Sequence, residues 1–305
     1  MAKDDSLPEL VPGLHQGKYS DGHPLDDVHY LECKIILKPD RFTSRQGFVD
    51  FAKLARRAAS SADVDLSTDH LDGQRPEIRE VVFLDTADFR LYRNAFILRR
   101  RITYEDGFPV GDPEIVFKFR HPDMQKAAEL DVRPHIPGVH RIKFKAETLP
   151  LKDKIGGMRV LFSHNVEFGL SQLKESDRTA MSALVRLFPC LAPLKGPGSD
   201  MVDLVNQTIV EEVLMDFGKL DFGKGVIAKS NAALWRERGG HKPLVGEYAF
   251  QAKFDRRDEL HPKVQRRCEE FFVSLQNIAH DWVSLGTTKT GIVYRLKGNA
   301  PQSDE

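Results

Sequence analysis

Residues 80–121 read EVVFLDTADFRLYRNAFILRRRITYEDGFPVGDPEIVFKFRH. This stretch contains three runs rich in β-branched and aromatic residues: EVVFLDT (80–86), AFILRRRITY (95–104) and EIVFKFRH (114–121). Turn-forming residues separate the runs, which favours short connections between strands. Two further runs follow: AAELDVR (127–133) and HRIKFKA (140–146). Strands that succeed one another without an intervening helix predict an antiparallel sheet and argue against βαβ units.

The rest of the chain adds strands and helices to this sheet. Alternation predicts strands at HYLECKIILK (29–38) and GEYAFQAKF (246–254), and further strands are read at 158–168 and 289–297. Apolar residues at helical spacing predict helices near 43–60, 171–188 and 261–285. The pattern therefore predicts an α+β fold that is mainly antiparallel β.

The composition predicts a soluble globular protein. Its 305 residues suit one large domain or two modest ones. Prolines and glycines among charged residues predict a loosely ordered arm over 1–27. Because linker signals are weak in the rest of the chain, we expect a single domain over 28–298, followed by a tail over 299–305. The 45 Lys and Arg residues balance 45 Asp and Glu residues, which argues against a globally basic nucleic-acid-coating protein. Three widely spaced cysteines, with neither a signal-peptide pattern nor a long apolar stretch, predict a cytoplasmic location without membrane contact.

The two faces of the predicted strands differ in charge. One face is apolar, and the other carries eleven basic and five acidic residues: Lys34, Lys38, Arg99, Arg101, Lys118, Arg120, Arg133, Arg141, Lys143, Lys145 and Lys253, with Glu32, Glu114, Glu129, Asp131 and Glu247. On a single strand this would be an ordinary solvated face. Across several strands, however, neighbouring cations repel one another. A closed barrel with helices outside would turn the charged face into a wet lumen, and an anion such as phosphate would neutralise it.

Several of these segments resemble the CYTH superfamily, the triphosphate tunnel metalloenzymes, which include thiamine triphosphatases, inorganic triphosphatases and class IV-type adenylate cyclases. YLECK (30–34) is similar to the first-strand signature Glu-x-Glu-x-Lys of that family. FLDTADFRLYRNAFILRRR (83–101) is similar to its Tyr-Phe-Asp-Thr-x-x-x-x-Leu…Leu-Arg-x-Arg segment. The strands at 114–120, 127–133 and 246–254 look like its later strands. The resemblance implies a closed or nearly closed β-barrel, or tunnel, with a polar, basic lumen and helices packed outside.

The inward face and the resemblance together imply a set of site residues. Glu32 and Lys34 are the expected catalytic residues. The expected phosphate-binding residues are Lys34, Arg99, Arg101, Lys118, Arg120, Arg141, Lys143 and Lys253. The expected metal ligands are Glu32, Glu247, Glu129 and Asp131, which would hold Mg²⁺ or Mn²⁺.

The chain departs from the family pattern at its acidic positions. Tyr30 stands in place of the first glutamate, and Ala249 and Gln251 stand where the family often has further acids. Two functions therefore stay open: metal-dependent hydrolysis of a triphosphate, and non-catalytic binding of a phosphate-type polyanion by a module with a degraded metal site. We favour the hydrolase, because the four remaining acids could together hold one ion.

The expected partner is a triphosphate-containing small molecule or polyphosphate. Nucleic acid is not expected, because alternation splits the run Arg99–Arg101 between two faces and no aromatic platform accompanies it. Assembly into a homodimer is left open.

Overall fold

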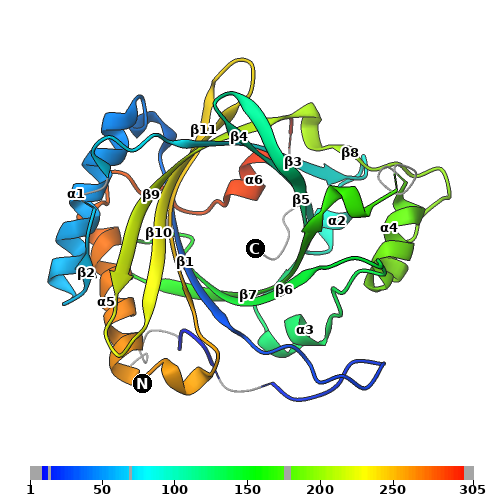
Figure 1. Cartoon of the computed structure of the whole chain (residues 1–305), viewed down its shortest axis with the longest axis horizontal. Coiled ribbons are helices and arrows are strands. Elements are labelled where there is room, and N and C mark those ends of the chain that lie inside the picture. The colour runs from blue at the N-terminus through cyan, green and yellow to red at the C-terminus, as the bar shows by residue number, and fades with distance from the viewer. Residues whose placement is uncertain (1–8, 13–14, 69–70, 175–179, 299–305) are drawn as a thin grey trace.

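Nine strands close into a barrel in the computed structural model, which describes residues 9–12, 15–68, 71–174 and 180–298 (Figure 1). Their order around the barrel is β9-β10-β11-β1-β6-β7-β5-β4-β3, and β3 pairs back with β9. Their bounds are β1 (Tyr30–Leu37), β3 (Glu77–Asp85), β4 (Phe96–Glu105), β5 (Phe108–His121), β6 (Arg141–Pro150), β7 (Met158–Gly169), β9 (Val210–Asp221), β10 (Ile227–Glu237) and β11 (Pro243–Lys253). The short strands β2 (Asp65–Leu66) and β8 (Asp203–Leu204) extend the sheet.

All pairings between these strands are antiparallel except that of β1 with β6. Closing the sheet leaves one face of every barrel strand inside and the other outside. The predicted α+β fold with a closed barrel is therefore confirmed.

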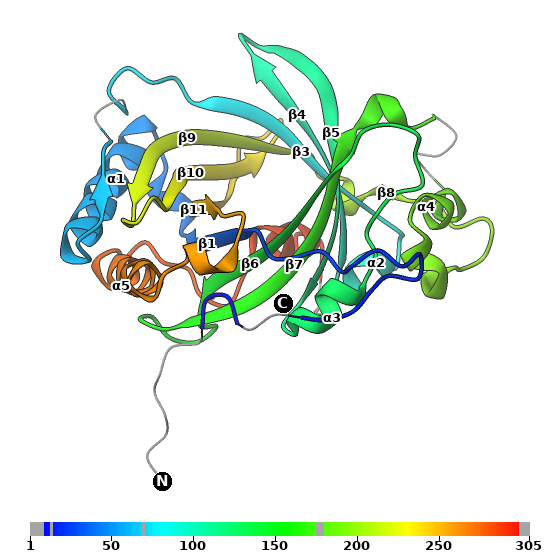
Figure 2. The ribbon, with the colours of Figure 1, turned by 60° about the horizontal axis from the view of Figure 1, so that its bottom comes forward.

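Two long helices, α1 (Arg45–Ser61) and α5 (Pro262–Ile278), lie side by side on the outside of the barrel (Figures 1 and 2). Both were predicted. The first begins where the Ser44 side chain accepts a hydrogen bond from the Gln46 amide, a common N-cap arrangement. The second ends earlier than the predicted 285, because the chain turns back and the Ser284 amide donates to the Ile36 carbonyl of β1. None of the described helices is long and apolar enough to cross a membrane.

Short helices cover the opposite side of the barrel. They are α2 (Arg90–Arg93), α3 (Met124–Glu129) and α4 (Met181–Leu187). The helix predicted over 171–188 is represented by a 3₁₀ turn (Leu170–Gln172) and by α4, while 175–179 lie outside the described residues. Leu184, Leu187 and Phe188 pack against Phe117 of β5 in a separate apolar cluster.

Two segments predicted as strands contain helices instead. The prediction of a strand at 127–133 was wrong: the Asp123 side chain accepts a hydrogen bond from the Lys126 amide and starts α3. The prediction of a strand at 289–297 was also wrong. There the Thr288 side chain accepts from the Gly291 amide and starts α6 (Lys289–Tyr294). In both cases a local side-chain cap supports a helix, and alternation alone does not reveal such a cap.

Helix α6 differs from the other helices because it lies within the ring of strands (Figure 1). Val293 and Tyr294 belong to one apolar cluster with Phe83, Trp235 and Ile36, three residues that also line the barrel's interior. Apolar packing with α6 therefore fills part of the interior.

The described part of the N-terminal arm packs on the barrel. Leu10, Val11 and Leu25 are buried in the same apolar cluster as Phe144 of β6. The Tyr19 hydroxyl donates to Asp26 at 2.9 Å. These contacts attach 9–12 and 15–27 to the outer face of the sheet.

Candidate functional site

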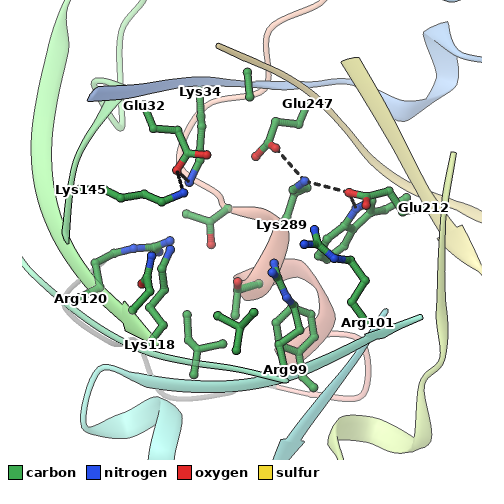
Figure 3. A pocket seen from close by; sticks show the side chains of 18 of the residues that line it. Glu32, Lys34, Arg99, Arg101, Lys118, Arg120, Lys145, Glu212, Glu247 and Lys289 are labelled. Atoms are coloured by element: carbon green, nitrogen blue, oxygen red, sulfur yellow. Dashed lines mark hydrogen bonds and ion pairs between the residues drawn. The ribbon is translucent and has the colours of Figure 1, made fainter. Parts of the chain in front are cut away.

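A cavity of about 280 Å³ lies inside the barrel, and all nine barrel strands contribute side chains to its wall (Figure 3). Nine of the lining residues are cationic: Lys34, Arg79, Arg99, Arg101, Lys118, Arg120, Lys143, Lys145 and Lys289. Four are acidic: Glu32, Glu167, Glu212 and Glu247. Cations therefore outnumber carboxylates in the wall, although the whole chain has no formal net charge.

A further carboxylate, Glu147, lies on the same face of β6 as the lining residues Lys143 and Lys145 and is fully buried. Its oxygens lie 2.6 Å from Lys118 Nζ, 3.0 Å from an Arg120 guanidinium nitrogen and 3.3 Å from Lys34 Nζ. The Ser163 hydroxyl also donates to it at 2.6 Å. Burial raises the pKa of Glu147, but the three cations outweigh this effect and hold the pKa well below its usual range. Glu147 thus fixes three cations of β1 and β5 in one cluster.

Glu32 of β1 is held between two lysines. Its carboxylate lies 2.8 Å from Lys34 Nζ and 3.3 Å from Lys145 Nζ. Burial opposes its ionisation, yet Lys145 and Lys34 lower the pKa of Glu32 below its ordinary value. Lys145 also donates to Gln251 at 2.8 Å, so an amide of β11 completes this group. The ring of Tyr30 lies about 6 Å from the Lys143 and Lys145 ammonium groups, an aromatic contact where the family has an acid.

A second acidic group lies across the cavity, around Lys289 at the start of α6 (Figure 3). Its ammonium lies 2.7 Å from Glu247 of β11 and 3.3 Å from Glu212 of β9. Glu212 also accepts a hydrogen bond from Trp235 Nε1 at 2.7 Å and lies 3.5 Å from Arg79. Burial raises the pKa of Glu212, but Lys289 and Arg79 lower it to about 2.

The arginines of β4 alternate between the two faces of the barrel. Arg99 and Arg101 line the cavity, and both approach Glu114 of β5, at 3.8 Å and 2.5 Å. Arg100 does not line this cavity and pairs instead with Glu80 at 3.1 Å. Burial and the neighbouring Arg101 lower the pKa of Arg99. The alternation predicted for this strand is therefore confirmed.

Most of the predicted site residues lie at the cavity: Glu32, Lys34, Arg99, Arg101, Lys118, Arg120, Lys143 and Glu247. Arg141 and Lys253 do not line it. Both have the expected strand parity, but they stand at strand ends, where their side chains are 64% and 62% exposed and pair with Glu167 and Asp255. Alternation gives the face of a strand and not the depth along the barrel, so it did not reveal that these two residues stand away from the cavity; phosphate binding by them stays a prediction.

Glu129 and Asp131 do not reach the cavity either. Glu129 ends α3 and accepts a hydrogen bond from Gln125 at 2.9 Å. Asp131 follows in the next segment and binds the Arg133 guanidinium at 2.6 Å. The prediction that these two acids join Glu32 and Glu247 was wrong, because 127–133 is not a strand of the barrel.

Several residues of the cavity were not among the predicted site residues. They are Arg79, Lys145, Glu167, Glu212 and Lys289, which line it, and the buried Glu147. Two of them carried a usable signal, because Lys145 and Glu147 continue the spacing of Lys143 along β6. The ion pair of Lys289 with Glu212 joins residues 77 positions apart, and no local pattern predicts such a pair.

The acids that reach the cavity do not fit the expected Mg²⁺ or Mn²⁺ site. In the register of β1 with β11, Glu32 lies opposite Gln251 and Glu247 lies opposite Ile36, which places the two acids four positions apart. That offset corresponds to roughly 13 Å along the strands. The described residues contain no group of three His, Cys, Asp or Glu side chains placed to hold a metal ion. Each pocket carboxylate is instead paired with a lysine or arginine of the chain.

No family model and no curated protein matches this sequence. Solved structures do match the fold. One is a Hippeastrum protein that was assigned by name as an adenylyl cyclase and is described as having a dominant triphosphatase activity, with 12% identity, a TM-score of 0.40, and coverage of 90% of this chain and 98% of that chain. Another is a Bacillus halodurans protein assigned by name as an adenylate cyclase, with 11% identity, a TM-score of 0.34, and coverage of 81% and 91%. A third is the PH1819 protein from Pyrococcus horikoshii, with 12% identity, a TM-score of 0.33, and coverage of 85% and 97%.

The closed barrel is the architecture that the motif resemblance implies. At these identities and TM-scores the likeness carries no information about the activity of this chain. We therefore take the function from the pocket itself.

Proposed function

We propose that the barrel pocket binds a triphosphate- or polyphosphate-type anion. The observation that carries this proposal is the excess of cationic over acidic side chains around one cavity. The cations outnumber the carboxylates of the wall and repel one another, so an anion in this cavity would offset that repulsion. Guanidinium groups bind phosphate in bidentate geometry, and lysine supplies point charge.

The size of the cavity limits the ligand. At about 280 Å³, its volume lies just below the usual range of ligand pockets, roughly 300 to 1,000 Å³. A short phosphate chain, or the phosphate end of a larger molecule, suits this space better than a bulky apolar ligand. The wall supports the same choice, because cations come from β1, β3, β4, β5, β6 and α6.

Calorimetric titration of the full chain with sodium tripolyphosphate tests the proposal. We expect saturable binding of tripolyphosphate. At matched ionic strength, sulfate should compete weakly with tripolyphosphate for the site, and chloride should not compete. An equal response to tripolyphosphate and to chloride would reduce the interaction to ionic strength alone and contradict the proposed site.

A second candidate function is hydrolysis of the bound triphosphate, a reaction for which the family resemblance implies Mg²⁺ or Mn²⁺. Glu32 favours this candidate, because an ionised carboxylate beside phosphate-binding lysines can orient a water molecule for attack. A screen of phosphate release from a triphosphate panel, with and without each metal, tests it. We expect Glu32→Gln to abolish any turnover while tripolyphosphate binding persists. Absence of release under every condition would leave binding as the function.

A further inference from the structure

The ammonium group of Lys289 occupies a position between two carboxylates of different strands. Glu247 reaches it from β11 at 2.7 Å and Glu212 from β9 at 3.3 Å. The Trp235 ring lies 4.6 Å away and adds a cation–π contact. Two converging carboxylates are an arrangement by which proteins also hold a divalent cation. Here a cation of the chain itself fills that position.

Helix α6 is what brings this cation into the barrel. Lys289 is its first residue, and the Thr288 cap fixes the start of the helix. Val293 and Tyr294 anchor the same helix in the apolar cluster inside the barrel. The ammonium is thus delivered by a packed element and not by a free loop.

The other pocket carboxylates are neutralised in the same way. Glu32 is paired with Lys34 and Lys145, and Glu167 is paired with Lys143 at 2.8 Å and with Arg141 at 2.6 Å. Among the described residues, every carboxylate that lines the cavity has a cationic partner from the chain. A divalent ion approaching these acids would therefore be repelled by a tethered lysine or arginine that already contacts each of them.

We propose that Lys289 is a resident counter-cation, and that the pocket binds its polyphosphate-type anion without a divalent metal. This inference rests on the proposed function and specifies how that site works. An ammonium has three N–H donors, of which the two carboxylates use two. The remaining donor and the lysines and arginines of the wall supply positive charge without recruiting an ion from solution. Mg²⁺ in solution would bind the phosphate chain, reduce its negative charge and weaken its attraction to the pocket.

Comparing tripolyphosphate binding in EDTA with binding in excess Mg²⁺, at matched ionic strength, tests the inference on the unaltered protein. We expect the dissociation constant in EDTA to equal or fall below that in Mg²⁺. Binding that requires Mg²⁺ would overturn the inference and leave the proposed anion site intact. Absence of binding in both buffers would overturn the proposed function and the inference together.

The variant Lys289→Gln tests the role of the residue. Loss of one hydrogen-bonding charge corresponds to roughly a ten- to hundredfold weaker affinity in EDTA. Because Glu212 and Glu247 are then free of the lysine, we expect Mg²⁺ to restore part of the affinity and to raise the Tm of the ligand-free variant. Lys53→Gln, at an exposed site on α1, is the matched control. It should change neither the affinity for tripolyphosphate in EDTA nor the response of the Tm to Mg²⁺.

The affinity of Lys289→Gln for tripolyphosphate in EDTA decides the assignment of Lys289. Unchanged affinity of Lys289→Gln in EDTA would overturn it. If unpaired carboxylates prevent this variant from folding, Lys289→Gln combined with Glu247→Gln removes one of them. The double variant should then show the same loss of affinity in EDTA.

Discussion

Arg100 and Arg101 are neighbours on β4 but belong to different faces of the barrel. Arg101 lines the cavity, whereas Arg100 is paired with Glu80 away from it. We expect Arg101→Ala to weaken tripolyphosphate binding by roughly 1.5–3 kcal/mol, the range for hydrogen bonds to charged groups. Arg100→Ala should leave the affinity almost unchanged. Titration calorimetry on both variants measures this difference, and equal losses would show that the anion does not use the inner face of β4.

The charge of Glu212 in the pocket makes the free energy of unfolding depend on pH in the acidic range. Burial opposes its charge, but Lys289 and Arg79 lower the pKa of Glu212 from 4.5 to about 2. A carboxylate whose pKa is lower in the folded state stabilises the fold above its unfolded pKa. That contribution, about 3 kcal/mol, is lost as the pH falls through the folded pKa. We therefore expect stability to decline between about pH 4.5 and pH 2.

Urea unfolding measured across this pH range provides the test. In Lys289→Gln the pKa of Glu212 should lie closer to its ordinary value, so the variant should have less of this stability at neutral pH and a shallower decline on acidification. An identical pH profile for the variant and the unaltered protein would show that Lys289 does not stabilise the carboxylate.

At the scale of elements, Asp85 organises the connection between β3 and β4. Its buried carboxylate accepts hydrogen bonds from the Thr86, Leu91 and Tyr92 amides at 2.7, 2.9 and 3.0 Å, and from the Tyr294 hydroxyl at 3.0 Å. The same carboxylate therefore holds α2 in place and ties it to α6. The Asp-Thr pair that carries the family resemblance has a structural role in this chain, next to the strand that presents Arg99 and Arg101.

We expect Asp85→Ala to lower the free energy of unfolding by about 3 kcal/mol or more, because each buried donor left without an acceptor costs roughly 1–3 kcal/mol. Asp88→Ala, at a half-exposed carboxylate in the same turn, should cost less than about 1 kcal/mol. Urea unfolding of both variants measures the effect. Similar losses in the two variants would contradict the role assigned to Asp85.

The sequence predicted elements where alternation was long and regular. In β5 the apolar Phe117 and Phe119 flank Lys118, and the structure places the lysine inside as expected. The segment 127–133 begins with the helix-favouring residues Ala127, Ala128 and Glu129, which continue a helix started by the Asp123 cap, so its acids were assigned to the wrong place. The pairing of Lys289 with Glu212 depends on closure of the barrel and on α6, neither of which leaves a local signal.

The whole molecule carries no net charge, yet its interior cavity concentrates cations. The four lining carboxylates, with Glu147 and Glu114 beside them, offset part of that charge and leave an excess for a ligand. A ligand that binds only the folded state stabilises it by mass action. At a concentration about 100-fold above the dissociation constant, tripolyphosphate should add roughly 2.7 kcal/mol to the free energy of unfolding.

Thermal melting in tripolyphosphate, sulfate and chloride at equal ionic strength measures this stabilisation. We expect the largest rise in Tm with tripolyphosphate and the smallest with chloride, because several phosphate groups on one chain can engage several cations of the wall at once. Arg101→Ala should reduce the tripolyphosphate shift, whereas Arg100→Ala should retain it. Since general screening acts on all surface charges alike, it would produce equal shifts in all three salts and in both variants. Such a result would mean that the cavity's cations are balanced within the fold and that its excess charge does not serve a bound anion.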